Sequence, residues 1–180
     1  MNKNLALLAA VSVLALSANA NALEFRPYVG AQYNYTEVDA DFVKADMNSY
    51  SVVVGTEYNK YFSTEVFYQN SDKSNDMIEG KKVKSDFEAY GLDAYAYIPL
   101  GCDRVWSVFA TAGIANYDSD TTSTTDKGED NGLGYRLGAG IQYSVTNDIA
   151  IRAIARHIWA DKLEDVDDMK EFSLGVKYAF

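Results

Sequence analysis

The sequence predicts an all-β fold in which eight antiparallel strands close into an up-and-down barrel. Three observations support this fold class. From Leu23 onward, apolar and polar residues alternate with a period of two, which is the side-chain period of a β-strand. The alternating segments are joined by connections that are in turn short and long. Aromatic residues make up 13% of the 180 residues and only two residues are prolines, a composition that favours strands.

The first 22 residues have the pattern of a cleaved signal peptide. A lysine precedes a nearly continuous apolar run from Leu5 to Leu16, and small residues then provide two cleavage sites, after Ala20 or after Ala22. An uncleaved anchor is the alternative, but the apolar run is shorter than the roughly 20 residues that a membrane-spanning helix requires. We therefore expect residues 1–22 to be a signal peptide and residues 23–180 to form one barrel domain in an exported compartment.

The alternation divides the exported chain into eight segments with two classes of connection. The segments lie near 24–36, 48–58, 61–70, 86–98, 104–117, 132–144, 148–160 and 170–180. Tight turns are predicted at Asn59-Lys60, Pro99 to Asp103 and Val145 to Asn147. The long, polar connections are the stretches near 37–47, 71–85, 118–131 and 161–169. Transmembrane barrels show this asymmetry, with short periplasmic turns and longer outer loops, so an even strand number places both termini in the periplasm.

Alternation alone does not decide the solvent, because soluble lipocalin-like barrels alternate too, with the apolar face inward. Nine of the 12 glycines share the parity of the polar strand residues, which suits the narrow lumen of eight strands: Gly30, Gly55, Gly91, Gly113, Gly132, Gly134, Gly138, Gly140 and Gly175. Charges take the same parity, and on a lipid face an arginine or lysine would cost about 2–4 kcal/mol at mid-membrane. We expect these charged residues to form a network in the lumen: Arg26, Glu57, Glu65, Asp93, Arg136, Arg152, Arg156 and Lys177.

Aromatic residues gather at both ends of the apolar face. Those near the outer ends are Tyr35, Tyr50, Tyr68, Tyr90, Tyr135, Trp159 and Phe172. Those near the periplasmic ends are Phe25, Tyr58, Phe62, Trp106, Tyr143 and Phe180. Two such belts fit the two interfaces of a membrane. The sequence therefore predicts a transmembrane barrel with an apolar outside and a polar, packed inside.

The last two hairpins carry the most specific pattern. Residues 132–143 read Gly-Leu-Gly-Tyr-Arg-Leu-Gly-Ala-Gly-Ile-Gln-Tyr, and the final strand ends on the alternate apolar residues Phe172, Leu174, Val176, Tyr178 and Phe180. This pattern resembles the OmpA-like and opacity-protein-like outer-membrane barrels of the porin family. The resemblance implies that the five alternate residues are an assembly signal, which the barrel-assembly machinery reads after periplasmic chaperones have delivered the chain. Alternatively, Phe180 is merely the apolar end of a strand.

Few residues outside the lumen suggest chemistry. His157 is the only histidine, predicted to face lipid near the outer end beside Trp159. Outer-membrane lipid A deacylases resemble this setting with a His/Ser pair, but tryptophan stands at the alternate position here, so an interfacial aromatic role is favoured. Cys102 is the only cysteine, so it has no partner for an internal disulfide, and a passive turn residue is favoured over a reactive thiol.

Two of the predicted outer connections are rich in acidic residues. These residues are Asp118, Asp120, Asp126, Glu129 and Asp130 in the third connection, and Asp161, Glu164, Asp165, Asp167 and Asp168 in the fourth. Their oxygens suit Ca²⁺ or Mg²⁺, including ions that bridge lipopolysaccharide. Neither stretch has the EF-hand spacing, so solvated, self-repelling loops are favoured and no metal site or cofactor is predicted.

These observations lead to a hypothesis for function with several alternatives. We expect a non-enzymatic protein of the outer membrane of a Gram-negative bacterium, which contributes to envelope structure and surface-loop interactions and whose lumen is plugged by the charged network. The alternatives are a gated, narrow porin for small solutes, an adhesin and, more distantly, a lipid-modifying enzyme. The expected partners are outer-membrane lipids, lipopolysaccharide and a host or environmental surface ligand. The net charge of −10 argues against nucleic acid.

Overall fold

The computed structural model describes residues 25–40, 43–71, 74–78, 81–101, 105–123, 126–161 and 168–180, and side chains within 25–37, 47–71, 88–101, 105–117, 132–159 and 169–180. The strands are β1 (Arg26–Ala40), β2 (Val43–Asn59), β3 (Phe62–Ser71), β4 (Ser74–Ile78), β5 (Lys81–Leu100), β6 (Trp106–Ser123), β7 (Asp126–Ser144), β8 (Ile149–Asp161) and β9 (Asp168–Ala179). No helix within these residues is long and apolar enough to cross a membrane. The predicted signal peptide and its cleavage sites lie outside the described residues.

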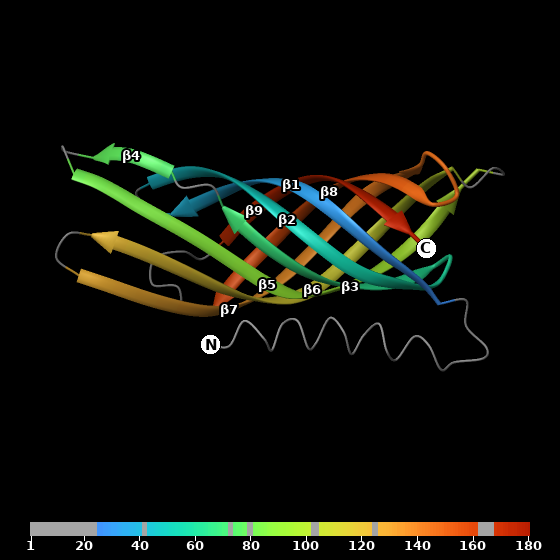
Figure 1. Cartoon of the computed structure of the whole chain (residues 1–180), viewed down its shortest axis with the longest axis horizontal. Helices are drawn as coiled ribbons and strands as arrows, with labels where there is room; N and C mark the ends of the chain where they lie inside the picture. The colour runs from blue at the N-terminus through green and yellow to red at the C-terminus, as the bar shows by residue number, and fades with distance from the viewer. Residues whose placement is uncertain are drawn as a thin grey trace.

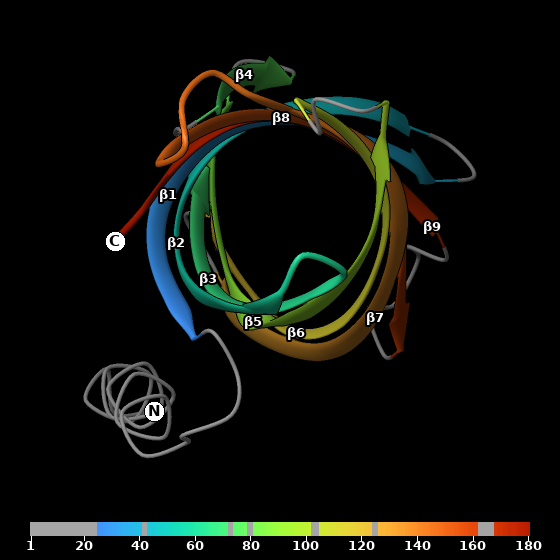
Figure 2. The same ribbon diagram turned by 90° about the vertical axis from the view of Figure 1, so that its right-hand side faces the viewer.

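Eight of the strands form a closed antiparallel barrel. The hydrogen-bonded order is β3-β2-β1-β9-β8-β7-β6-β5, and a further pairing of β3 with β5 closes the ring. Figure 2 shows this ring along the barrel axis. β4 is a ninth, short strand that pairs with the first residues of β5, from Ser74 against Ser85 to Ile78 against Lys81. The predicted eight-stranded, up-and-down barrel is therefore confirmed.

The strands extend farther than the alternation predicted. β1 and β2 pair as far as Ala40 with Val43, and β6 and β7 as far as Ser123 with Asp126, so most of the stretches 37–47 and 118–131 are strand rather than loop. The stretch 71–85 contains β4 and the start of β5. The prediction was wrong there because ladder hydrogen bonds join backbone groups, which need no apolar side chain. Hydrophobic periodicity detects only the part of a strand that meets an apolar phase.

The two ends of the barrel differ in their connections. β1 begins and β9 finishes at one end, here called the terminus end, where Lys60-Tyr61 and residues 145–148 form short turns. Thr146 Oγ1 accepts hydrogen bonds from the backbone N–H groups of Asp148 (3.2 Å) and Ile149 (3.0 Å), which shapes the second turn. Gly101 adopts a φ of 75°, a conformation that favours glycine, after β5. The opposite end, here called the loop end, holds the extended hairpins (Figure 1).

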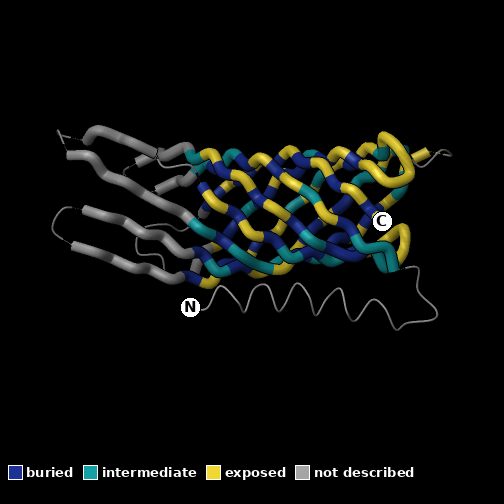
Figure 3. The backbone as a smooth tube through the Cα atoms, in the orientation of Figure 1, coloured by how far each residue is buried: buried dark blue, intermediate teal, exposed yellow. Residues whose placement is uncertain are grey.

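Side chains alternate along most of the barrel strands between the lumen and the outside of the barrel. Figure 3 shows buried and exposed residues largely in turn along the coloured parts of the barrel strands, and from Met169 to Phe180 the pattern is unbroken. Gly55 shows why the inward glycines are needed: a Cβ atom there would lie 2.3 Å from Cζ of Tyr28, whose ring covers the glycine. In a lumen this narrow, a large side chain on one strand requires an empty position on its neighbour.

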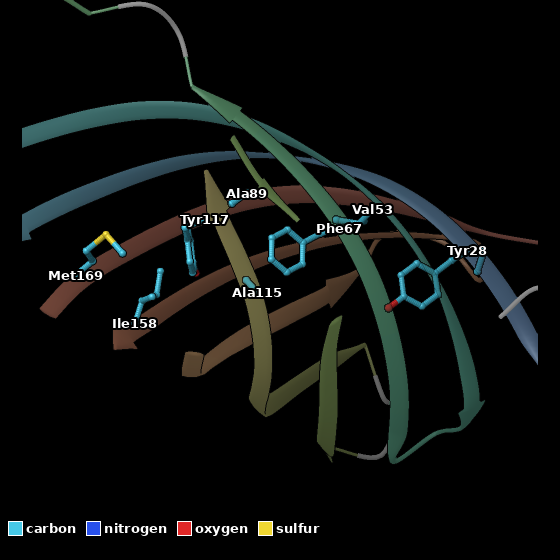
Figure 4. Packing of buried hydrophobic residues seen from close by; sticks show 9 residues of the cluster. Tyr28, Val53, Phe67, Ala89, Ala115, Tyr117, Ile158 and Met169 are labelled. Atoms are coloured by element: carbon cyan, nitrogen blue, oxygen red, sulfur yellow. The ribbon is translucent and has the colours of Figure 1, made fainter. Parts of the chain in front are cut away.

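The lumen also holds apolar side chains, which the prediction of a polar, packed inside did not identify. One buried cluster runs along the barrel and includes Val53, Phe67, Tyr117, Ile158 and Met169 (Figure 4). A second cluster consists of Tyr95, Tyr97, Phe109 and Ile154. Parity reports only that a residue points inward. A closed lumen is packed like a protein core, and bulky apolar side chains fill it as well as polar ones do.

Candidate functional site: the charged lumen

Six ionisable side chains from five strands meet inside the barrel, and each is at most 4% exposed. They are Glu65 on β3, Asp93 on β5, Arg136 on β7, Arg152 and Arg156 on β8, and Glu171 on β9. The three arginines and three carboxylates carry opposite charges in equal number. An unpaired charge at such depth is strongly unfavourable, so pairing is the condition for this arrangement.

Glu65 is the centre of one half of the network. Arg152 Nη2 donates to Glu65 Oε2 at 2.6 Å, and the hydroxyl of Tyr28 donates to the same oxygen at 3.0 Å. The other carboxylate oxygen accepts from the hydroxyl of Tyr95 at 2.9 Å and from the amide of Gln32 at 3.3 Å. Both oxygens of Glu65 are thereby satisfied by four donors from three strands, β1, β5 and β8.

Glu171 is the centre of the other half. Its Oε1 accepts from Arg156 Nη1 at 3.0 Å and from Arg136 Nη2 at 3.4 Å, while its Oε2 accepts from the amide of Gln69 at 2.9 Å. Arg156 Nη1 also donates to Ser173 Oγ at 2.8 Å. This half therefore ties β7, β8 and β9 to β3 across the lumen.

Asp93 and Tyr95 join the two halves. Asp93 Oδ1 lies 3.2 Å from Arg136 Nε, and Oδ2 lies 3.5 Å from Arg156 Nη2. The approach of Asp93 to Arg136 depends on Gly113, which stands between them in the sheet and whose Cβ, if present, would lie 1.9 Å from Asp93 Oδ1. The Tyr95 hydroxyl accepts from Arg156 Nη2 at 3.0 Å and donates to Glu65. The six charges thus form one connected network.

Aromatic rings pack against the guanidinium groups. Arg136 lies over the ring of Phe67 at 4.1 Å, and Arg152 lies near the ring of Tyr95 at 5.2 Å. Tyr95 and Phe109 in turn contact each other edge to face, with ring centroids 5.5 Å apart. A guanidinium over an aromatic face is stabilised by the ring quadrupole, most strongly where water is excluded. The charged network is therefore embedded in aromatic packing.

The remaining predicted charges lie toward the terminus end. Lys177 Nζ donates to Glu57 Oε1 at 2.6 Å and lies 4.7 Å from the ring of Tyr28. Arg26 is at the rim, where it pairs with Asp148 at 2.5 Å, and the two side chains are 35% and 54% exposed. The structure thus divides the eight predicted residues into five in the central network, the partly buried pair of Lys177 and Glu57 toward the terminus end, and Arg26 at the rim.

Sequence reasoning missed several members of the network. Glu171 is a full partner of two arginines, and Gln69, Tyr28 and Tyr95 supply hydrogen bonds. Glu171 stands at one of the alternate positions of the last strand whose side chains point into the lumen. Marking these positions in every strand is therefore enough to identify it. The inward tyrosines could not be recognised in the same way, because the sequence analysis assigned aromatic residues in strands to the lipid face.

A match to a protein-family model decides the kind of protein that carries this lumen. Residues 6–180 match the model of the outer membrane protein beta-barrel domain. The chain belongs to this family. The predicted resemblance to outer-membrane barrels is thereby confirmed at the level of the family. No curated protein matches the sequence at a significant level.

Solved structures of outer-membrane proteins share the fold of this family member. Neisserial surface protein A has a TM-score of 0.68 at 19% identity, covering 86% of this chain and 97% of its own. Ail, the attachment invasion locus protein of Yersinia pestis, has a TM-score of 0.65 at 17% identity, covering 88% and 100%. The N-terminal barrel of OprF from Pseudomonas aeruginosa has a TM-score of 0.62 at 15% identity, covering 85% and 97%. At these identities the likeness shows the fold alone.

The outer surface of this outer-membrane barrel is apolar and carries aromatic residues at both ends. The residues of the proposed assembly signal all face outward and are exposed: Phe172, Leu174, Val176, Tyr178 and Phe180. Exposed rings near the loop end include Tyr50, Tyr135 and Trp159, and those near the terminus end include Trp106 and Tyr143. In water such a surface would be a liability, whereas in lipid it is the stabilising face.

The other candidate residues form no reactive site within the described chain. His157 is half-buried on the outer face, with its ring 4.3 Å from that of Trp159. Cys102 and the acidic residues of 118–130 and 161–168 lie outside the residues whose side chains are described. Among the described residues, no group of three or more His, Cys, Asp or Glu side chains is placed to hold a metal ion.

Proposed function

We propose that this protein is a non-enzymatic, non-conducting outer-membrane barrel that contributes to envelope structure and presents its loop end to partners outside the cell. The observation that carries this proposal is the lumen. Buried ion pairs between Arg152 and Glu65 and around Glu171 cross it, and aromatic side chains fill the space around them. With the lumen occupied, the surfaces left for function are the lipid face and the two ends.

The lengths of the connections support a proposed orientation of the barrel in the membrane. The terminus end has short turns, and the long hairpins are at the loop end (Figure 1). Barrels inserted from the periplasm place their short turns there and their longer connections outside. In this orientation Phe180 lies at the periplasmic interface, where the assembly machinery meets the last strand, and the described hairpins of the loop end face the exterior. The partners proposed for this end are lipopolysaccharide, bound through bridging divalent cations, and a surface ligand.

Conductance of the purified protein in planar lipid bilayers tests the proposal. We expect no steady single-channel steps, under conditions in which an established porin gives them. A liposome-swelling assay with small sugars provides a second measurement, and the same absence of flux is expected. Reproducible steps whose amplitude changes on Arg152→Ala would overturn the plugged lumen and favour the narrow porin instead.

Deletion of the outer segments tests the role of the loop end. Removal of residues 119–130 from cells that express the protein is expected to leave assembly intact, because the barrel wall is complete without them. The loss of binding to a surface partner, or of envelope resistance to a cation chelator, would support a role of this end. Turnover of a lipid substrate that His157→Ala abolishes would instead support the enzyme.

A further inference from the structure

A cavity of about 610 Å³ opens at the terminus end of the barrel, and we refer to it as the vestibule. Its wall comes from several strands and turns, and Tyr97 and Lys177, both buried, contribute to it. Tyr97 also stacks on Tyr95 and contacts Phe109 within the buried aromatic cluster. The vestibule therefore borders the buried aromatic cluster, and it is accessible from the terminus end. Its volume is in the range of small-molecule sites, about 300–1,000 Å³.

The charges around the vestibule are largely neutralised within the protein. Lys177 is bonded to Glu57 at 2.6 Å, and Arg26 is bonded to Asp148 at 2.5 Å. Lys60 is the remaining cation of the lining, and it lies 4.8 Å from the ring of Tyr61. A site for an ion requires an excess of opposite charge at its base, and paired charges do not supply one. The vestibule is thus matched to a ligand without net charge.

Neutral hydrogen-bonding groups and apolar surfaces make up the rest of the wall. The neutral polar residues are Asn59, Ser107, Gln142, Ser144, Thr146 and Asn147. Phe25, Tyr97 and Pro99 provide apolar surface between them. A ligand that presents many hydroxyl or amide groups and one apolar face matches this alternation, and a sugar ring has both.

Gln142 provides the strongest indication of a ligand. It lines the vestibule, only 9% of its surface is exposed, and its Oε1 accepts no hydrogen bond from the protein. A buried amide oxygen without a donor is unfavourable, so a donor from a bound molecule stabilises it. The other two glutamines are already bonded, Gln32 to Glu65 and Gln69 to Ser49 and Glu171.

From this geometry we infer that the vestibule is a binding site for a neutral carbohydrate of one or two rings, with the buried amide of Gln142 as a hydrogen-bonding group of its wall. In the orientation proposed above the site opens to the periplasm. Binding of the carbohydrate, however, depends neither on that orientation nor on whether the lumen is plugged. The carbohydrate is either a free sugar or an N-acetylated glycan of the cell wall, which share hydroxyl groups and a ring face.

The glutamine side chains provide a direct test, because the chain contains only Gln32, Gln69 and Gln142. Protein labelled with ¹⁵N at the glutamine side-chain amides is placed in phospholipid nanodiscs, since detergents with sugar headgroups would compete. N-acetylglucosamine, its β-1,4-linked dimer, maltose and sodium sulfate are then titrated separately. We expect a saturable shift of the Gln142 amide alone, with a midpoint of about 1–10 mM, and unchanged signals from Gln32 and Gln69.

Variants and the choice of sugar make the outcome decisive. Gln142→Leu is expected to remove the binding of the responding sugar, measured by ligand-observed saturation transfer, whereas Asn70→Leu, which changes an exposed amide outside the vestibule, is expected to retain it. A response to the N-acetylated sugars assigns the site to cell-wall glycan, and a response to maltose alone assigns it to free sugars. No shift with any sugar, a stronger shift with sulfate, or equal shifts of all three amides overturns the inference.

Discussion

The ion pair between Arg152 and Glu65 is the most direct test of how the lumen is held together. We consider Glu65→Gln, Arg152→Met and the two substitutions combined. Glu65 accepts hydrogen bonds from four side chains and is 1% exposed, and Arg152 is equally buried. Each single substitution leaves a full charge in the lumen without its partner, whereas the combined variant leaves none.

The size of the effect follows from this burial. Breaking one partner of a buried ion pair costs about 3–5 kcal/mol, because the remaining charge is neither solvated nor compensated. We therefore expect each single variant to lose about that much of the free energy of unfolding. The combined variant is expected to lose clearly less than the sum, and less than either single variant if methionine fills the space of the arginine. The exposed pair at the rim serves as the control: Arg26→Met is expected to lose at most about 1 kcal/mol.

Urea unfolding of the unchanged protein and the four variants in lipid vesicles, followed by tryptophan fluorescence and by heat-dependent electrophoretic mobility, measures these differences. The coupling energy is the difference between the combined loss and the sum of the single losses. Losses below about 1 kcal/mol for both single variants, or strictly additive losses, would refute the argument that the lumen charges depend on each other. A similar loss for Arg26→Met would show that exposure does not govern these pairs.

Three further predictions concern packing, lipid contact and assembly. Gly113→Ala places a Cβ atom against Asp93 Oδ1 and is expected to reduce stability by about 1–3 kcal/mol in the same unfolding assay, and an unchanged stability would show that the network has free space. Leu174→Arg, in the middle of an exposed, lipid-facing strand, is expected to cost about 2–4 kcal/mol, whereas Leu174→Ala is expected to cost much less; equal losses would argue against lipid contact. Deletion of Phe180 is expected to reduce insertion into the outer membrane without affecting export across the inner membrane, as measured by cell fractionation, and normal insertion would contradict its role in assembly.

The sequence by itself determined the strands and their two faces. Leu174 and Tyr135 stand at positions whose side chains contact lipid, where apolar side chains are stabilised. Because such positions alternate along a strand, the sequence shows a period of two. The same rule identified Glu65, Asp93 and Arg136 as inward residues, because a charge in a strand of this kind has no other favourable place. The sequence pattern of the last two hairpins also indicated that the barrel resembles those of outer-membrane proteins.

Only the tertiary structure decided which inward residues meet. Arg152 and Glu65 are 87 residues apart and touch because the stagger of the closed strands brings them to one level of the lumen. Arg26 has the inward parity but pairs with Asp148 of a turn, since it lies at the rim, and Glu171 proved to be a centre of the network. The vestibule and its Gln142 likewise depend on closure. Parity is a property of one strand, whereas contacts across a lumen are properties of the ring.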